Sequence, residues 1–303
     1  MSTLFSQFFN KINRISPLEH KFTEGLDAIA LKPKMLYFYG KIPENVTENG
    51  VLKRTKSVAI VGARRNTRYG EEVAYKMAFE LARRGVVIVS GLALGIDSIA
   101  HRAALDAGGV TVAVLGTPID QIYPRQHEEL AKEIVEKGGA IISEYAPGEK
   151  VFPKVSFLAR NRLISGLSDV VVIVEAAAKS GTLSTAMHAL DQGKDLLAVP
   201  GNITSPLSEG CNKLINQGAI PYTGVDDVMR ILFPQRKKWA QPVIFGDSTE
   251  ETGILRAISD GVSDGEQIME RLKMTASTFN QTVTLMEIKG MIRSLGANRW
   301  MMN

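Results

Sequence analysis

A short segment, Phe157-Leu-Ala-Arg-Asn-Arg162, places an aromatic ring beside two guanidinium groups and a side-chain amide. One predicted strand later, Ser180-Gly-Thr-Leu-Ser-Thr185 opens a helix with small residues whose backbone amides can bind an anion. Guanidinium groups bind phosphates, and an aromatic ring stacks on a nucleobase. We find no pairing of a nucleophile with a base and no cluster of metal ligands beside these residues. The pattern therefore predicts binding of a phosphate-rich polymer, with no chemistry on it and no cofactor.

The first predicted strand-to-helix turn, residues 62–70, carries three arginines, Arg64, Arg65 and Arg68. It lacks Gly-x-Gly-x-x-Gly, and the next strand ends in Ser90-Gly91, where a dinucleotide site needs an acidic residue. The chain also lacks the Walker sequence of phosphate-binding loops that hydrolyse ATP. The turn thus suits phosphates better than NAD or ATP, although a solvated basic loop explains it equally well when it is taken alone.

The elements that must position these residues follow an alternating pattern. Apolar, mostly β-branched runs occupy residues 58–61, 86–89, 111–115, 140–142, 170–174 and 196–199. Helix-length amphipathic stretches lie between them at 71–84, 96–107, 128–137 and 183–192. Such an alternation indicates an α/β fold in which helices cover both faces of a mostly parallel sheet. We therefore predict a Rossmann-like domain over residues 53–232, preceded by a short N-terminal extension, 1–52.

The alternation of strands and helices ends after residue 232. Residues 233–248 contain two prolines and a basic triplet without periodicity, which indicates a linker. Residues 249–303 predict three short helices and a hairpin, the pattern of a small winged-helix domain. Its acidic residues nearly balance its basic ones, and its third helix is poor in Arg and Lys. Because duplex binding rests on several phosphate contacts, a protein-contact or regulatory role is favoured for this domain.

Composition sets the outer limits of the function. The chain has 303 residues and a formal net charge of +4, which is compatible with a nucleic-acid partner without requiring one. A single cysteine, Cys211, excludes an intramolecular disulfide and is typical of a reducing compartment. The N-terminal residues lack the pattern of a secretory signal, and the apolar runs are too short to span a bilayer. We expect a cytoplasmic protein with no membrane partner.

Six ordered motifs together carry a resemblance to a known family. They are Gly62-Ala-Arg-Arg-Asn-Thr67, Ser90-Gly-Leu-Ala-Leu-Gly-Ile-Asp-Ser-Ile-Ala-His101, Gly116-Thr-Pro-Ile-Asp-Gln-Ile-Tyr-Pro124, the segment 157–167, the segment 175–186 and Pro200-Gly201. In this order they resemble the DprA/Smf family, the DNA-processing proteins of natural transformation. The resemblance covers roughly residues 33–232, and the tail is similar to the winged helix that many members carry.

The resemblance implies a Rossmann-like homodimer that binds single-stranded DNA, protects it and helps to load a RecA-type recombinase. It implies no enzymatic activity. Carried over by position, the residues expected to bind DNA or phosphate are Gly62, Arg64, Thr67, Gly91, Arg125, Phe157, Arg160, Asn161, Arg162, Lys179, Ser180, Gly181 and Thr182. Three positions depart from the family pattern: Ala63 replaces a serine, Leu158 replaces a proline, and Leu94 replaces a lysine that is often present.

Other functions are compatible with this topology. A nucleotide phosphoribohydrolase needs a glutamate in the helix that follows the phosphate loop, but Thr185 stands there and cannot act as a base at neutral pH. A nucleotide-sensing domain and a sequence-specific duplex regulator also remain as alternatives. Asp97 and His101 have the spacing of a metal pair, but a structural hydrogen bond is the preferred interpretation. Arg162 could serve a buried ion pair instead of DNA.

Overall fold

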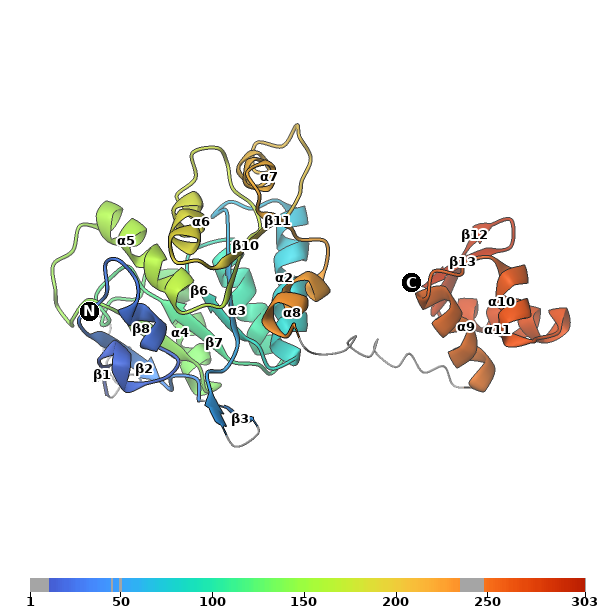
Figure 1. Ribbon diagram of the computed structural model, residues 1–303, viewed down its shortest axis with the longest axis horizontal. Helices are drawn as coiled ribbons and strands as arrows, with labels where there is room; N and C mark the ends of the chain where they lie inside the picture. Colours follow the sequence, from blue (N-terminus) through green and yellow to red (C-terminus); the bar gives the residue numbers. More distant parts are fainter. Residues whose placement is uncertain (1–10, 45, 49–50, 235–247, 303) are drawn as a thin grey trace. The chain divides into compact units, whose positions relative to one another are not determined.

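The computed structural model describes residues 11–44, 46–48, 51–234 and 248–302 (Figure 1). The chain forms two compact units, Met1–Pro234 and Gln235–Asn303, and each is described by itself. Most of the predicted linker, 233–248, lies outside the described residues, as do residues 1–10 of the predicted N-terminal extension. Within the described part of the chain, none of the helices combines the length and apolar character that crossing a bilayer requires.

A nine-stranded sheet forms the centre of the larger unit, in the order β1-β2-β8-β7-β6-β5-β9-β10-β11. Its strands are β1 (Asn13–Ile15), β2 (Leu36–Gly40), β5 (Ser57–Val61), β6 (Val87–Ser90), β7 (Thr111–Val114), β8 (Ala140–Ser143), β9 (Val170–Ile173), β10 (Asp195–Ala198) and β11 (Ile220–Pro221). All neighbours from β8 to β11 are parallel, whereas β1 pairs with β2 and β2 with β8 in antiparallel fashion. A separate hairpin consists of β3 (Val46–Glu48) and β4 (Val51–Lys53). The predicted mostly parallel sheet is confirmed.

Helices cover the sheet on both faces. They are α2 (Arg68–Arg83), α3 (Ile96–Asp106), α4 (Glu128–Glu136), α5 (Pro153–Gly166), α6 (Thr182–Asp191), α7 (Glu209–Asn216) and α8 (Val225–Leu232), with short 3-10 turns η1 (Pro17–Glu19), η2 (Glu24–Asp27) and η3 (Arg125–His127). Successive strand residues point to opposite faces, so each inner strand contributes to two cores. Val112 and Val114 of β7 belong to the cluster with α5, while Ala113 packs with α3 and α4.

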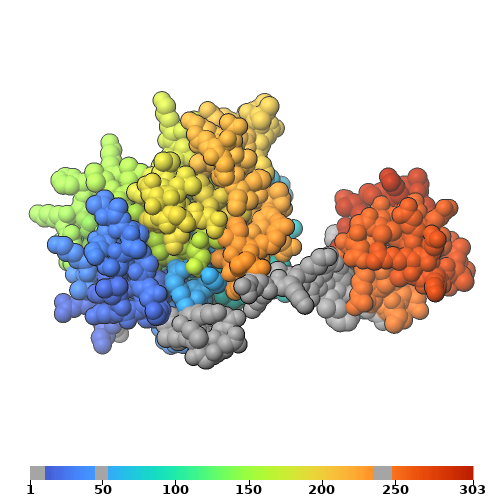
Figure 2. Space-filling model, viewed as in Figure 1, coloured from blue at the N-terminus to red at the C-terminus, as the bar shows by residue number. Residues whose placement is uncertain are grey.

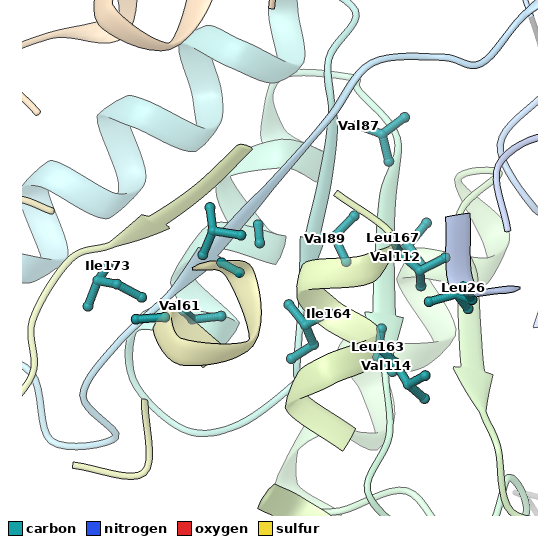
Figure 3. Close-up of a cluster of buried hydrophobic side chains, with 14 of the residues drawn as sticks. Leu26, Val61, Val87, Val89, Val112, Val114, Leu163, Ile164, Leu167 and Ile173 are labelled. Atoms are coloured by element: carbon teal, nitrogen blue, oxygen red, sulfur yellow. The ribbon is translucent and has the colours of Figure 1, made fainter. Parts of the chain in front are cut away.

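The face that carries α5 is the one that supports the site. Leu163 and Ile164 of α5, with Leu167 directly after it, pack in one core with the strand valines Val89, Val112 and Val114, as Figure 3 shows. Each is almost fully buried, and burial of a side chain of this size contributes roughly 1.5–3 kcal/mol to the free energy of folding. The anchored half of α5 therefore fixes the positions of Arg160, about one turn nearer the N-terminus of the helix, and of Phe157, about two turns nearer.

The N-terminal segment is part of the same unit. Strands β1 and β2 extend the sheet beyond β8, and Leu26 of η2 is fully buried in the core that contains α5. Figure 2 shows this blue segment in contact with the green and yellow elements. The sheet thus continues across the boundary predicted at residue 53. Sequence patterns missed β2 although Tyr37, Phe38 and Tyr39 favour a strand, because the helix-length amphipathic stretches that marked the other strands do not flank it.

The smaller unit contains three helices and a hairpin: α9 (Thr249–Ser259), α10 (Gly265–Leu272), α11 (Ala276–Ile288), β12 (Ile292–Gly296) and β13 (Arg299–Met302). Ser248, Asp264 and Thr275 cap the three helices by accepting hydrogen bonds from backbone amides. Phe279 and Met286 of α11 are buried in its core. This is the arrangement of helices and hairpin that the sequence predicts for the tail.

Candidate functional site

A cleft of about 390 Å³ opens at one edge of the large sheet. From β5 the chain continues to β6 on one side, whereas β9 lies on the other side of β5. Loops that leave the carboxyl ends of two such strands diverge, and ligands of open α/β sheets bind in the resulting crevice. The walls come from the loops after β5, β6, β9 and β10, from one side of α5 and from the first turns of α3 and α6. The lining residues are Val61, Gly62, Ala63, Arg64, Arg65, Ala93, Asp97, Phe157, Leu158, Arg160, Asn161, Ile164, Ala177, Ser180, Gly181, Thr182, Thr185 and Leu207.

Most of the predicted binding residues meet at this cleft. Those that line it are Gly62, Arg64, Phe157, Arg160, Asn161, Ser180, Gly181 and Thr182. Gly91 lines a smaller adjoining hollow, whose walls also include Arg64, Phe157 and Arg160. Thr67, Arg125, Arg162 and Lys179 are not among the lining residues of either space.

Arg64 and Phe157 form the exposed rim of the cleft. The Arg64 guanidinium carbon lies 5.6 Å from the centroid of the Phe157 ring, a cation–π arrangement. Arg64 is exposed and Phe157 is partly exposed, so both retain surface that a ligand can contact. The Tyr123 ring lies on Phe157 as well, with centroids 5.1 Å apart and planes inclined by 34°. A charge and two rings thus converge at one place.

Arg160 lies beneath the rim and is only 4% exposed. Its Nη1 donates to the carbonyl of Gly91 at 2.7 Å and to that of Val114, and its Nε donates to Asn161 Oδ1 at 3.2 Å. The pKa of Arg160 is lowered to about 10, mainly by burial, with Asp97 opposing the shift and Arg64 adding to it. The group is still protonated at neutral pH. It therefore ties the ends of β6 and β7 to α5 and places a positive charge in the floor of the cleft.

The loop between β9 and α6 is held by its own hydrogen bonds. Ser180 donates its amide to the carbonyl of Ala177 at 3.0 Å, and Thr182 donates its amide to Ser180 Oγ at 3.2 Å. Of the three amides predicted to bind phosphate, that of Gly181 alone has no acceptor within the described residues. Asn161 Nδ2 donates to the Gly181 carbonyl at 3.3 Å and so attaches the loop to α5. The loop offers an anion fewer donors than the sequence predicts.

Two of the three predicted glycines, Gly62 and Gly91, serve close packing around the cleft. A Cβ atom on Gly91 would lie 2.5 Å from Nη1 of Arg160, and one on Gly62 would lie 2.7 Å from Cγ1 of Ile96. The Gly62 carbonyl also accepts a hydrogen bond from Thr182 Oγ1 at 3.0 Å. Larger residues at these positions would displace the groups that shape the cleft.

Thr67, Arg125 and Lys179 occupy other places. Thr67 caps α2: its hydroxyl accepts from the Gly70 amide at 3.1 Å and donates to the buried carboxylate of Glu175 at 2.5 Å. Arg125 and Lys179 are exposed, on η3 and on the loop before α6, each next to lining residues. Thr67 therefore supports the turn that carries Arg64, while the two cations flank the cleft.

Arg162 belongs to the interior of the fold. Its guanidinium forms a two-pronged ion pair with Glu144, with distances of 2.8 and 2.6 Å, and its Nε donates to the carbonyl of Leu31 at 2.7 Å. The residue is 8% exposed. Its donors thus bond to the loop after β8 and to the N-terminal segment. This is the buried ion pair predicted from the sequence as an alternative role for Arg162.

Several lining residues were not predicted as binding residues. Leu158 and Thr185 line the wall between α5 and α6, and Arg65 follows Arg64 on the rim. Arg65 could have been found from its place in the arginine turn. Leu158 gave no signal, because an exposed leucine beside Phe157 is indistinguishable in sequence from a core residue. Tyr123 precedes a proline, and the sequence indicated only a turn there.

Asp97 and His101 do not face a common ligand. Asp97 Oδ2 accepts from the Gly91 amide at 3.0 Å, and burial raises the pKa of Asp97 against the opposing effects of Arg160 and backbone donors. His101 Nδ1 lies 2.7 Å from Thr111 Oγ1, and burial lowers the pKa of His101 to about 3. Across the described ranges, His, Cys, Asp and Glu side chains form no group of three or more that could hold a metal ion.

Comparisons with known proteins agree with this architecture. Residues 13–233 match the family model described as DNA recombination-mediator protein A. The chain is 36% identical over 243 residues to the DNA processing protein DprA of Bacillus subtilis, a match that covers 78% of this chain and 80% of the relative. It is 47% identical over 175 residues to Protein Smf of Escherichia coli, which covers 58% of this chain and only 46% of that relative.

A solved structure shows the same fold. DNA processing protein A from Helicobacter pylori, described for its single-stranded DNA binding mode, superposes with a TM-score of 0.63 at 34% identity. The match covers 75% of this chain and 98% of that one. By the extent of the family match and by its similarity to these relatives, the chain belongs to the DNA recombination-mediator protein A family.

Proposed function

We propose that the cleft binds single-stranded DNA without sequence preference and that the chain acts as a recombination mediator, not as an enzyme. One observation carries this proposal: Arg64, Phe157 and the loop 180–182, which are far apart in sequence, line the same cleft. The family description and the single-stranded DNA binding of the Helicobacter pylori relative support it.

Each part of the cleft has a distinct role in this proposal. The exposed Arg64 guanidinium binds a phosphate, and the Gly181 amide adds a second donor from the loop between β9 and α6. Phe157 stacks on a base, which accepts any sequence because every base presents a π face. Buried Arg160 contributes positive potential from below while its own donors remain bound to carbonyls. Recognition is thus electrostatic and stacking in character, with no reading of base edges.

The test compares labelled single-stranded DNA, duplex DNA of the same sequence and mononucleotides in one buffer of fixed salt concentration. We expect tightest binding to the single strand, since only unpaired bases expose both a face and a flexible phosphate backbone. Equal or tighter binding to the duplex would contradict the proposal. Binding that saturates with a mononucleotide alone would favour a nucleotide-sensing domain.

A phosphoribohydrolase remains the enzymatic alternative, and the cleft makes it testable. Thr185, at the position where such an enzyme needs its glutamate, is buried and lines the cleft. A hydroxyl cannot supply the carboxylate chemistry of N-glycosidic cleavage. We expect no release of free base from nucleoside monophosphates, measured by chromatography over hours at high protein concentration.

The protection of the strand, a homodimer and the loading of a RecA-type recombinase in the cytoplasm complete the proposal. Two clefts in one dimer would raise the apparent affinity for a long strand above that of either cleft, because the second contact becomes intramolecular. Sedimentation at micromolar concentration tests the dimer. Nuclease digestion of bound oligomers tests protection, and the rate of recombinase filament formation on single-stranded DNA tests loading.

A further inference from the structure

The Tyr123 ring lies at the edge of the smaller hollow, where a ligand could contact it. The sequence indicates only a turn at this position. The Tyr123 ring contacts Phe157 with a centroid separation of 5.1 Å, yet the residue is 50% exposed. A tyrosine that only covered a neighbouring ring would bury more of its own surface. The exposed part of this ring is available for stacking on another planar group.

Tyr123 lines the smaller hollow beside the cleft. The hollow has a volume of about 40 Å³, and its walls include Tyr123, Pro124, Leu94 and the two rim residues Arg64 and Phe157. This space is too small to enclose a base, so a base would lie across its mouth against the Tyr123 ring. Leu94, which is 36% exposed, offers an apolar surface on the facing loop.

Arg64 and Phe157 form a wall common to both spaces, since they line the cleft and the hollow alike. A strand that passes over this wall would have one base on the cleft side and its neighbour on the Tyr123 side. The phosphate that joins the two nucleotides would then lie over the exposed Arg64 guanidinium. A cation between two stacking surfaces is the arrangement that single-stranded nucleic acid requires.

The turn that carries Tyr123 is held in place from below. His127, which is 5% exposed, donates through Nδ1 to the carbonyl of Leu92 at 2.8 Å. Leu92 adopts a left-handed backbone with φ of 58°, a conformation that a leucine keeps only when its surroundings enforce it. The His127 hydrogen bond thus joins the Tyr123 turn to the loop of Leu94. Ring and facing wall are fixed before a ligand arrives, which reduces the entropy lost on binding.

We propose that Tyr123 is a second base-stacking residue, so that two adjacent bases of a single strand flank the wall formed by Arg64 and Phe157. This inference rests on the proposed function and adds a subsite to it. The Tyr123 ring and Leu94 carry no charge, so the subsite accepts any base and contributes stacking without a phosphate contact.

The experiment measures the affinity of the full chain for two probes of equal length, an oligothymidylate and an oligomer whose bases have all been removed. Tyr123→Leu removes the ring but keeps apolar cover over Phe157. We expect it to weaken binding of the oligothymidylate at least about fivefold and to leave binding of the abasic oligomer unchanged. The slope of log K against log salt stays that of the unmodified chain, because no phosphate contact is lost.

Two further variants keep the test sharp. Tyr123→Phe retains the ring and should recover the affinity that Tyr123→Leu loses. Tyr75→Leu is the matched control, since Tyr75 is an exposed tyrosine on α2, 40% exposed and outside both spaces. Equal losses on both probes, no loss on oligothymidylate, or no recovery with Tyr123→Phe would each overturn the inference.

Phe157→Ala separates this failure from that of the proposed function. If Phe157→Ala weakens oligothymidylate binding and Tyr123→Leu does not, the second subsite is wrong and the cleft stands. If neither substitution changes the affinity, the proposed site as a whole is wrong.

Discussion

The turn 62–67 and the segment Arg160-Asn161-Arg162 of α5 are both rich in arginine, yet the fold uses them in opposite ways. On the turn, Arg64 and Arg65 are exposed at the rim of the cleft. On α5, Arg160 and Arg162 are 4% and 8% exposed and donate to carbonyls or to Glu144. The difference follows from the elements: a loop at a strand end faces solvent, whereas the half of α5 that carries Arg160 and Arg162 is buried against the sheet.

The comparison teaches which arginines are available to a ligand. A guanidinium has five N–H donors in a fixed fork, and burial without partners is costly. Arg160 and Arg162 have found those partners inside the protein, so DNA would have to replace existing hydrogen bonds. Arg64 lies beside the Phe157 ring and makes no side-chain hydrogen bond to the described residues, so its donors can turn to a phosphate at little cost. The hydrogen bonds of buried arginines therefore act on stability, and exposed arginines are the ones that can contact a phosphate directly.

The largest effect expected from this contrast is the loss of stability when Arg162 is replaced. Replacing it by methionine leaves Glu144 as an unpaired, largely buried charge, which costs about 3–5 kcal/mol in the free energy of unfolding. Urea denaturation measures the loss. In the double variant Arg162→Met with Glu144→Gln, much of the stability should return. A loss below about 1 kcal/mol would show that the pair is screened by solvent and that Arg162 is free for another role.

Phe157→Ala is the largest expected effect on binding. The ring gives a base its stacking surface, and such a stack contributes about 1–3 kcal/mol, so affinity for single-stranded DNA should fall about tenfold. The substitution also removes the surface on which Arg64 rests. Fluorescence anisotropy with labelled oligothymidylate measures the change. Phe79→Ala on α2, a partly buried phenylalanine outside the cleft, serves as the control and should bind like the unmodified chain.

The sheet and most of its helices could be predicted because their apolar periodicities are strong. The six predicted strands match β5 to β10 to within one residue at each end. The helix α5 could not be recognised in the same way, since it is buried on several sides and carries Arg160, Asn161 and Arg162 in its interior half. Its polar residues interrupt the apolar stripe, and only tertiary partners such as Glu144 make their burial possible.

For the site, residue type and position predicted which segments converge but not which side chains face the cleft. The turn 62–67, the segment 157–162 and the loop 180–182 do line one space. The direction of each side chain along a buried helix depends on the rotation of that helix, which the sequence pattern left undetermined. Thus Phe157 reaches the rim, while Arg162, five residues later, points to Glu144.

Arg64→Ala tests the exposed side of the comparison. Loss of one phosphate contact should reduce the magnitude of the slope of log K against log salt by about 0.7 on single-stranded DNA and leave the free energy of unfolding unchanged. Titrations at several salt concentrations measure the slope. Arg68→Ala is the matched control: this arginine is exposed at the start of α2, directly after the turn, pairs with Glu72 at 2.9 Å and does not line the cleft. An unchanged slope for Arg64→Ala would remove the phosphate contact from the proposal.

His127 tests whether a buried residue can affect binding as well as stability. It is buried, yet its hydrogen bond to the Leu92 carbonyl fixes the loop that faces Tyr123. We expect His127→Phe to lower the free energy of unfolding by about 1 kcal/mol, the net value of one hydrogen bond, and to weaken binding of single-stranded DNA a few-fold.

His127→Asn distinguishes positioning from packing, because the asparagine Nδ2 can donate from nearly the place of the histidine Nδ1. If the hydrogen bond positions the loop, this smaller side chain restores oligothymidylate binding, although it fills the space less well than phenylalanine. If packing alone matters, phenylalanine retains binding and asparagine loses it. Denaturation and anisotropy on the same two variants separate the outcomes, because a positioning effect appears in affinity for oligothymidylate but not for an abasic strand. If the positioning outcome is observed, buried His127 contributes to binding through the backbone of Leu92. The contrast between the two arginine-rich regions then applies only to groups that could contact DNA directly.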